Sequence, residues 1–230
     1  MMKSIFLVSI FLLMLSCTAS TITQNKSKPS DEGLIAYYKF DGNPSDSKGS
    51  NNGSSYRMRY LAFDKRNTQG IAEFDGSNSY INLPNKFDFR DRTISFWVRA
   101  KEIPVEGAII FVSDNPTMQY GLTVFGVKQE GQNRNLVFNF SSQVFTTSIE
   151  KGKWYHVAAS LQDKSYRYYL NGKLASSGTL VNYTKSGNGH PAAIIGSSRV
   201  HDRIFNGSLD DLRIYNRALS DAEIAVLAIP

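Results

Sequence analysis

Carboxyl groups at close spacing are the first residues of this chain that could do chemistry. Hydrolysis of a glycosidic bond needs two carboxyl groups that face each other, about 5 Å apart in retaining enzymes and further apart in inverting enzymes. Glu73 and Asp75 are two positions apart, so they would share one face of a strand. Asp75 directly precedes Gly76, and an aspartate at such a position typically bonds its own backbone in a turn. We therefore interpret this segment as structural.

The other candidate groups do not form a catalytic set. Asp210 and Asp211 are adjacent, so on a strand their side chains are expected to point to opposite faces and cannot pair. His156, His190 and His201 are scattered and lack the spacing of metal ligands or of a nucleophile and its base. The sequence contains no Gly-x-Ser-x-Gly elbow and no phosphate-binding loop. The prediction is a protein that is not an enzyme.

One loop is rich in side chains that carry oxygen. Asp41, Asn43 and Asp46 lie close together, and Gly42 between them can adopt unusual backbone angles. Calcium takes six to eight oxygen ligands, so this composition suits it chemically. The loop is not an EF-hand, because its twelfth position is Asn52 rather than glutamate. Asp and Asn are also ordinary turn formers, so a plain loop is the alternative.

Two clusters of aromatic and basic side chains could form binding edges. Sugar sites combine aromatic side chains with a few fixed polar groups, and loops often supply them. One cluster is Tyr56, Arg57, Arg59 and Tyr60, and the other is Arg199, His201, Asp202 and Arg203. Solvated loops are the alternative for both clusters. The sequence alone assigns no ligand-binding residue.

The charge balance argues against nucleic acid as a partner. The formal net charge is +6, from 26 Lys and Arg against 20 Asp and Glu. The cations are spread along the chain, and Lys164, Arg167 and Lys173 have acids nearby. A nucleic-acid site would need a basic stripe or a surface on which bases stack. Anionic glycans or an envelope surface are the better expectation.

The first residues predict export. Lys3 precedes a stretch from Ile5 to Leu15 that is apolar apart from Ser9 and shorter than the ~20 residues of a membrane-spanning helix. Cys17, the only cysteine, follows in a sequence similar to the lipobox of bacterial lipoproteins, where this residue receives the lipid. We expect residues 1–16 to be a signal peptide and Cys17 to be lipidated, with an ordinary signal peptide as the alternative. The protein would then be anchored to a membrane of the bacterial envelope, which we take to be the outer membrane.

The rest of the chain divides into a tether and one domain. Residues 17–31 are rich in Ser, Thr, Lys and Asn, which is typical of a flexible linker. Residues 32–230 show no repeat and no shift in composition, so one domain is expected there. A single cysteine excludes a disulfide framework, and a domain of this size can bury a sufficient core without one.

Period-two patterns predict an all-β body. Residues 93–99 alternate, with Ile94, Phe96 and Val98 on one face, which is typical of a half-covered strand. Further strands are expected at 34–40, 136–140, 154–160 and 209–215, and glycines such as Gly107 and Gly126 are interpreted as turn positions. Many short strands separated by turns favour an antiparallel two-sheet jelly-roll sandwich.

Two local signals are more specific. Asn171-Gly172 separates two strand-like segments and predicts a tight hairpin, because both central residues of that turn need a positive φ. Ser220 and Glu223 have the spacing of a capping box, which predicts a short helix over residues 222–228. So short a helix is marginal alone and must pack against the sandwich.

Several segments match the pattern of a known family, in the same order along the chain. Residues 33–53, 72–81 and 93–99 are similar to its early strands, and 154–158 to a later central strand. The most specific match is 205–220, with the sequence FNGSLDDLRIYNRALS. The chain resembles the laminin-G-like jelly-roll family, within the concanavalin A-like lectin/glucanase superfamily, over nearly all of residues 33–228.

The resemblance adds expectations about the site. The glucanase branch of the superfamily carries a Glu-x-Asp-x-Glu pattern, and here Ser77 stands at the position of the third carboxylate. Members often hold a structural calcium ion that joins the first strand to the last. This implies Asp41 and Asp210 as its ligands, with Asn43, Asp46 or backbone carbonyls completing the shell.

The superfamily contains lectins, carbohydrate-binding modules, adhesion domains and glycoside hydrolases. We expect a non-catalytic binding or adhesion module, lipid-anchored at the cell envelope, that recognises carbohydrate or an extracellular protein. A glycoside hydrolase of the same superfamily is the first alternative. A structural component of an envelope complex is the second.

Overall fold

The computed structural model describes most of the predicted domain. The described residues are 28–63, 69–85, 87, 91–113, 123–140, 143–180 and 192–230. The predicted signal peptide (1–16), the lipidation site Cys17 and His190 lie outside them. Within the described part of the chain, no helix is long and apolar enough to cross a membrane.

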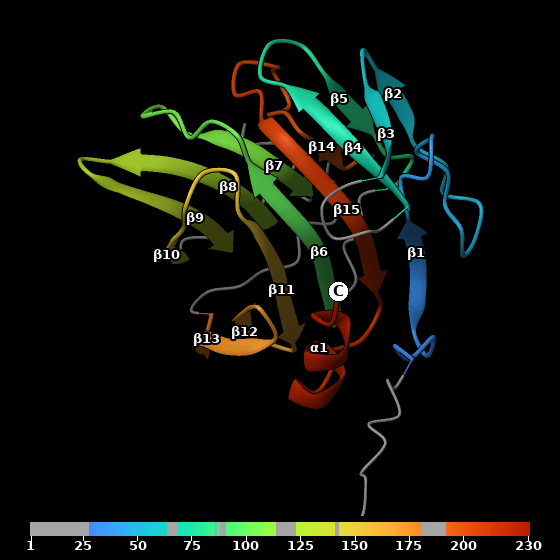
Figure 1. Cartoon of the computed structure of the whole chain (residues 1–230). Helices are drawn as coiled ribbons and strands as arrows, with labels where there is room; N and C mark the ends of the chain where they lie inside the picture. Colours follow the sequence, from blue (N-terminus) through green and yellow to red (C-terminus); the bar gives the residue numbers. More distant parts are fainter. Residues whose placement is uncertain are drawn as a thin grey trace, which may run out of the picture.

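Two antiparallel sheets stack face to face (Figure 1). The eight-stranded sheet consists of β1 (Leu34–Tyr38), β3 (Arg59–Phe63), β4 (Gln69–Asp75), β6 (Arg92–Ala100), β11 (Trp154–Gln162), β12 (Ser165–Leu170), β13 (Lys173–Thr179) and β15 (Asn206–Tyr215). Its order is β13-β12-β11-β6-β15-β4-β3, with β1 also paired to β15. Neighbours that are distant in sequence, such as β6 and β15, give the sheet its jelly-roll connectivity.

The seven-stranded sheet lies behind the first in Figure 1. It consists of β2 (Ser54–Tyr56), β5 (Tyr80–Asn82), β7 (Ala108–Ser113), β8 (Thr123–Glu130), β9 (Asn133–Phe140), β10 (Gln143–Ser148) and β14 (Ile194–Ile195). Its order is β10-β9-β8-β7-β14-β5-β2. The predicted all-β, two-sheet antiparallel jelly-roll sandwich is confirmed.

Aromatic side chains from both sheets fill the space between them. Phe96 on β6 meets the edge of Phe125 on β8, with ring centroids 5.0 Å apart. Phe138 on β9 stacks on Tyr168 of β12 at 5.4 Å. Such pairs contribute about 0.5–1.5 kcal/mol beyond the burial of their area. The core therefore fixes how the two sheets face each other, and with them the loops at both ends.

Strand β6 was predicted to have one buried face and one exposed face, and its second face differs from that prediction. Ile94, Phe96 and Val98 point into the core as expected. Thr93 on the opposite face is also buried, because the segment after β15 lies over it and the amide of Leu219 donates to its hydroxyl at 2.9 Å. The expected half-covered strand is thus covered on both sides.

The predicted hairpin at Asn171-Gly172 and the predicted short helix after Ser220 are both confirmed. Asn171 and Gly172 connect β12 to β13 with φ angles of 49° and 76°. Helix α1 (Asp221–Leu227) begins after Ser220, whose hydroxyl accepts from the amide of Glu223 in a capping box. Ile224 and Leu227 turn toward the outer face of the eight-stranded sheet and are buried there.

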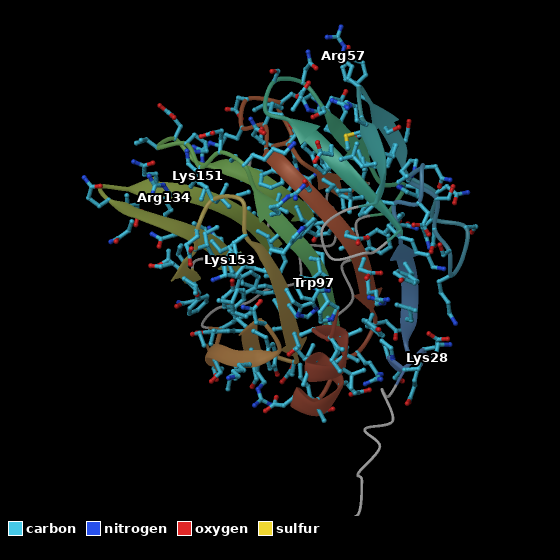
Figure 2. The ribbon with its side chains drawn as sticks, in the orientation of Figure 1. Lys28, Arg57, Trp97, Arg134, Lys151 and Lys153 are labelled. Atoms are coloured by element: carbon cyan, nitrogen blue, oxygen red, sulfur yellow. The ribbon has the colours of Figure 1, made fainter. Side chains whose placement is uncertain are left out.

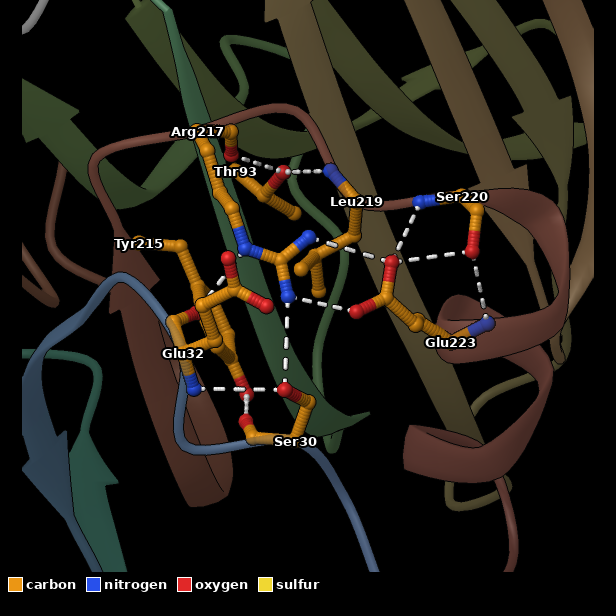
Figure 3. A network of polar contacts seen from close by, with 8 residues as sticks. All are labelled: Ser30, Glu32, Thr93, Tyr215, Arg217, Leu219, Ser220 and Glu223. Carbon is orange, nitrogen blue, oxygen red and sulfur yellow. Dashed lines mark hydrogen bonds and ion pairs between the residues drawn. The ribbon is translucent and has the colours of Figure 1, made fainter.

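Arg217 ties α1 to the start of the domain (Figure 3). Its guanidinium contacts the Glu223 carboxylate at 2.5 Å and donates to the carbonyl of Glu32 at 2.9 Å. The Tyr215 hydroxyl donates to the carbonyl of Ser30 at 3.3 Å. These contacts hold residues 30–32 and the helix together at one end of the sandwich.

Candidate functional site

The outer face of the seven-stranded sheet carries a small cluster of apolar side chains. Side chains alternate along its strands, so Phe125 and Phe138 enter the core while their neighbours Val124 and Val137 face outward. Four outward side chains form a separate small cluster, with Tyr80 packed against it: Ile109, Val112, Val124 and Ile194. These four side chains are at most 6% exposed, so they are packed and do not form an open patch.

A hollow of about 150 Å³ opens over this face between β7, β8 and β9, and we call it the β8 hollow. Apolar residues of the three strands line it: Ile109, Val124 and Val137, with Gly126. Polar side chains also line it: Glu106, Lys128, Asn139 and Arg203. An apolar floor with a few polar groups around it is the usual composition of a small-molecule site.

Gly126 explains why the sheet is hollow at this point. It lies within β8, so its interpretation as a turn position is wrong. A Cβ on Gly126 would lie 2.6 Å from the carbonyl oxygen of Ala108 on the paired strand β7, whose register with β8 shifts between Ile109 and Phe111. Only glycine permits this approach of the two backbones. The missing side chain leaves open space between its outward neighbours.

Asn139 contributes an incompletely satisfied polar group to the hollow. Its Oδ1 atom is buried and has no hydrogen-bond partner among the described residues. A buried acceptor without a partner costs about 1–3 kcal/mol. Rotation of the amide about its terminal bond exchanges the positions of its oxygen and nitrogen. At its present position the oxygen is not reached by solvent, so a ligand could bond to it only after such a rotation.

A loop formed by residues 197–204 walls one side of the hollow. The amide of Ile109 on β7 donates to the carbonyl of Arg203 at 3.1 Å, and a parallel bridge pairs Ile109 with Ile204. Within the loop, the Ser198 hydroxyl donates to Asp202 at 2.5 Å. Ser197 and the ring of His201 are hydrogen-bonded at 3.0 Å. These bonds give the loop a defined shape and hold Arg203 beside the hollow.

A stack of rings pins the same loop to the sheet. The rings of Tyr80 and His201 lie 4.2 Å apart, and Tyr56 lies 5.2 Å from Tyr80 on β5. The guanidinium of Arg57 covers Tyr56 at 5.5 Å and projects from the end of the sandwich (Figure 2). Because the rings face one another and Arg57, they serve to join β2, β5 and the loop.

The fold thus rearranges the two aromatic-basic clusters expected from the sequence. Tyr56 and His201, one from each cluster, meet on either side of Tyr80. Arg59 and Tyr60 do not join them, because they belong to β3 in the other sheet, where Tyr60 packs against the core. Arg203 alone of the predicted residues lines the β8 hollow.

The loop predicted to bind calcium uses its oxygens internally. The carboxylate of Asp46 accepts from the amides of Tyr37 and Lys48, both at 2.9 Å, and from the amide and side chain of Asn51. Burial raises the pKa of Asp46, but these hydrogen bonds lower it further, so the pKa lies below its usual value. Asn43 Oδ1 accepts from the amide of Ser45 at 2.9 Å. In this structure both side chains accept from donors of the protein itself.

The two acids of β15 share one face, which corrects the expectation that they point apart. A bulge after Asp210 places Leu209 and Leu212 both in the core. On the outer face, Asp210 is paired with Trp97 of β6. Trp97 is labelled in Figure 2. Asp211, with a φ of 53°, accepts from the Tyr37 hydroxyl on that same face at 2.5 Å.

Arg213 is the cation that contacts this acidic region. Arg213 lies 4.0 Å over the ring of Tyr37 and 3.3 Å from the carboxylate of Asp211. Burial and the charge of Asp211 raise the pKa of Tyr37 well above its ordinary value. Burial, together with the same Asp211, raises the pKa of Asp41, so Asp41 lies near this group. The described residues contain no cluster of three or more His, Cys, Asp or Glu suited to a metal ion.

The remaining candidates have structural contacts. Glu73 contacts Lys101 at 2.6 Å and accepts from Ser208 at 2.8 Å. Asp75 accepts from the amides of residues 77, 78 and 79, which confirms the expected turn. His156 is buried on the outer face of the eight-stranded sheet, with its Nε2 atom 2.8 Å from the Ser95 hydroxyl.

Sequence comparison decides the family. The model Laminin_G_3, described as the concanavalin A-like lectin/glucanases superfamily, matches residues 75–225. The chain belongs to the concanavalin A-like lectin/glucanase superfamily. Every residue around the β8 hollow lies within the matched part of this concanavalin A-like domain. No curated protein matches the chain.

Solved structures of three kinds share the concanavalin A-like fold. Domain 4 of AbnA, an extracellular arabinanase from Geobacillus stearothermophilus solved with arabinotriose, has a TM-score of 0.67 and 24% identity, over 85% of this chain and 98% of that one. The binding domain of botulinum neurotoxin DC with rat synaptotagmin II has a TM-score of 0.66 and 17% identity, over 86% and 51%. Trypanosoma rangeli sialidase with sialic acid has a TM-score of 0.70 and 17% identity, over 88% and 33%. The chain thus spans about half the length of the toxin binding domain and about a third of the length of the sialidase.

Most residues of the β8 hollow were not predicted from the sequence. Val124, Val137 and Asn139 have the composition of any outward-facing strand positions, so nothing marks them individually. Gly126 carried a usable signal, because a glycine inside a strand often marks a bulge or the close approach of another group. The bulge of β7 that makes this glycine necessary becomes visible only when the two strands are paired.

Proposed function

We propose that this protein is a non-catalytic module that binds carbohydrate in the β8 hollow. The observation that carries the proposal is the hollow itself, with an aliphatic floor, polar side chains around it and the partnerless oxygen of Asn139. A sugar ring has apolar C–H faces and hydroxyl edges, so it matches both parts of such a site. The arabinanase domain of similar fold, solved with arabinotriose, supports a saccharide as the ligand.

The acids around the hollow favour binding over hydrolysis. Glu106 is the one carboxylate among the described residues that line it. Glycoside hydrolysis by the usual mechanism requires two carboxyl groups on opposite sides of the scissile bond. Asp210 and Asp211 lie on the other sheet, where Asp211 contacts Tyr37 and Arg213. A lectin-like role therefore fits this chain better than a glycoside hydrolase.

A glycan array with the purified protein tests the proposal. We expect binding to at least one saccharide series, and we expect the variant Val137→Phe to lose at least tenfold in affinity because the larger ring fills the hollow. Leu174→Phe is the matched control, since Leu174 is 44% exposed on β13 of the opposite sheet. Equal binding by the wild type and Val137→Phe would contradict the proposal, as would a silent array.

We also propose that the module is exported and held at the bacterial cell envelope by a lipid on Cys17. The apolar stretch before the only cysteine supports export, and the Ser/Thr-rich residues 18–31 would separate the domain from the membrane. Metabolic labelling with a fatty acid tests the anchor. Label on the wild type and none on Cys17→Ala is expected, whereas an unlabelled wild type would contradict it.

Calcium stays a prediction for Asp41, Asn43, Asp46 and Asp210. It would require Asn43 and Asp46 to exchange their present hydrogen bonds for metal contacts. Thermal melting in EDTA and in excess calcium is the direct measurement. A higher midpoint in calcium supports the site, and equal midpoints remove it.

An extracellular or envelope protein is the second candidate partner. Exposed valines favour it: Val105, Val144 and Val200 are 57% to 62% exposed on loops and on the edge strand β10. The toxin binding domain of similar fold was solved with the protein synaptotagmin II. A silent glycan array together with retention of an envelope protein on the immobilised wild type, and not on Val144→Asp, would favour this candidate.

A further inference from the structure

The β8 hollow is closed on the side of the 197–204 loop. The bond from the amide of Ile109 to the carbonyl of Arg203 joins the loop directly to β7. The bridge between Ile109 and Ile204 extends that contact. The stack of the His201 ring on Tyr80 fixes the loop to β5 as well. A glycan chain that continued past Arg203 would therefore meet backbone rather than an open groove.

A second wall is formed by residues 104–107. The carbonyl of Pro104 accepts from the amide of Gly107 at 3.1 Å and from the amide of Gln129 on β8 at 3.0 Å. This fixes the turn over the end of β8 and places Glu106 and Gly107 along the hollow. The hollow is therefore bounded at one end along the strands and on one side across them.

The size of the hollow limits what it can hold. Its volume is about 150 Å³, and a cavity of about this volume in another protein holds one benzene ring. That is room for one sugar ring and not for several. Ile109 and Val124 on its floor are only 6% exposed, so the floor is fixed by packing before any ligand arrives.

We propose, on the basis of the proposed function, that the β8 hollow binds the terminal pentose or hexose residue of a glycan end-on. Asn139 is then the specificity-determining residue: after rotation of its amide, the side-chain oxygen accepts from one hydroxyl of that sugar residue. The rest of the glycan, beyond this first sugar ring, leaves the hollow toward solvent and makes few contacts with the protein. An internal stretch of a polysaccharide continues in two directions, and each of the two walls blocks one direction in which it could continue.

Chain length provides the first test. An array presents the di-, tri- and tetrasaccharides of arabinose, xylose, galactose, glucose and mannose, each attached through its reducing end. We expect one series to bind with signals that agree within twofold across lengths, and the free monosaccharide to compete as well as the trisaccharide. A signal that rises tenfold or more from di- to tetrasaccharide overturns end-on binding while leaving carbohydrate binding intact. Silence for every series overturns both.

Asn139→Leu provides the second test. We expect about tenfold weaker binding of the series identified on the array, with an unchanged or higher melting temperature because the partnerless oxygen is removed. Asn135→Leu is the matched control on the same strand, where Asn135 already accepts from Ser148 at 3.4 Å and lies outside the hollow. It should lose stability and keep its affinity. Unchanged affinity in Asn139→Leu would remove Asn139 from the site.

Discussion

Single side chains in this domain often have a different role from the one their chemistry suggests. Asp46 belongs to the loop predicted to bind calcium, and it organises this loop after β1 by accepting hydrogen bonds from three residues of the protein. Gly126 has the composition of a turn residue, yet it permits β7 and β8 to approach and creates the β8 hollow. In both cases the deciding factor is the neighbouring backbone, which a single sequence does not display.

Asp46→Asn should destabilise the domain. An amide cannot accept from all the donors that face Asp46, and hydrogen bonds to a charged group contribute about 1.5–3 kcal/mol, so we expect a loss of about 2 kcal/mol in the free energy of unfolding. Because the folded pKa of Asp46 is lowered, its contribution is present above the unfolded pKa of about 3.9 and is lost as pH falls through the folded value.

Chemical denaturation at neutral pH measures this effect. Asp41→Asn is the matched control, because Asp41 is exposed in the same loop and its replacement should change stability by no more than about 0.5 kcal/mol. Equal stability of Asp46→Asn and the wild type would show that these hydrogen bonds do not organise the loop.

At the scale of elements, contacts between distant segments determine where the site lies. The stack of Tyr56, Tyr80 and His201 joins two short strands to the 197–204 loop, and Arg217 joins α1 to residues 30–32. The hairpin at Asn171 and the capping box at Ser220 were predictable, because each depends on residues adjacent in sequence. The ring stack was not, since its members are 121 positions apart at Tyr80 and His201.

The loop contact leads to a prediction about a residue that does not line the hollow. His201→Ala removes a ring stack that contributes about 0.5–1.5 kcal/mol, and the 197–204 loop beside Arg203 loses this contact with Tyr80. We expect glycan affinity to fall about threefold to tenfold, because in this variant the 197–204 loop must become ordered when the glycan binds. His201→Tyr retains a ring against Tyr80 and should retain more of the affinity. If both variants bind like the wild type, the loop is not a wall of the site.

The helix contact predicts a specific response to acid. The hydrogen bonds from Arg217 lower the pKa of Glu223 to about 2. Stability from this pair is therefore fully present above the unfolded pKa of about 4.3 and is lost as pH falls toward 2. Glu223→Gln should melt at a lower temperature than the wild type at pH 6, and the difference should shrink by pH 2.

Thermal melting across this pH range measures the response. Glu150→Gln is the control, since the side chain of Glu150 is 75% exposed in its contact with Lys153. A difference between Glu223→Gln and the wild type that stays constant from pH 6 to pH 2 would contradict an ion pair at this position.

At the scale of the whole molecule, the two outer faces of the sandwich have different roles. The outer face of the eight-stranded sheet is occupied by α1, by the Ser95–His156 contact and by the Tyr37, Asp211 and Arg213 group. The seven-stranded sheet carries the β8 hollow on its outer face. Period-two patterns were sufficient to predict the sandwich, because they report which side chains are buried. They do not report which outer face is covered, so the side of the sandwich that carries the candidate site could not be predicted.

Two-dimensional NMR of the labelled protein, titrated with the saccharide that the array identifies, tests the location of the site most directly. The account predicts that the largest shift changes fall on the amides of Gly126, Ile109 and Val137 and on the side-chain amide of Asn139. Changes centred instead on the Trp97 indole, or on the loop from Asp41 to Asp46, would place binding elsewhere and contradict the account.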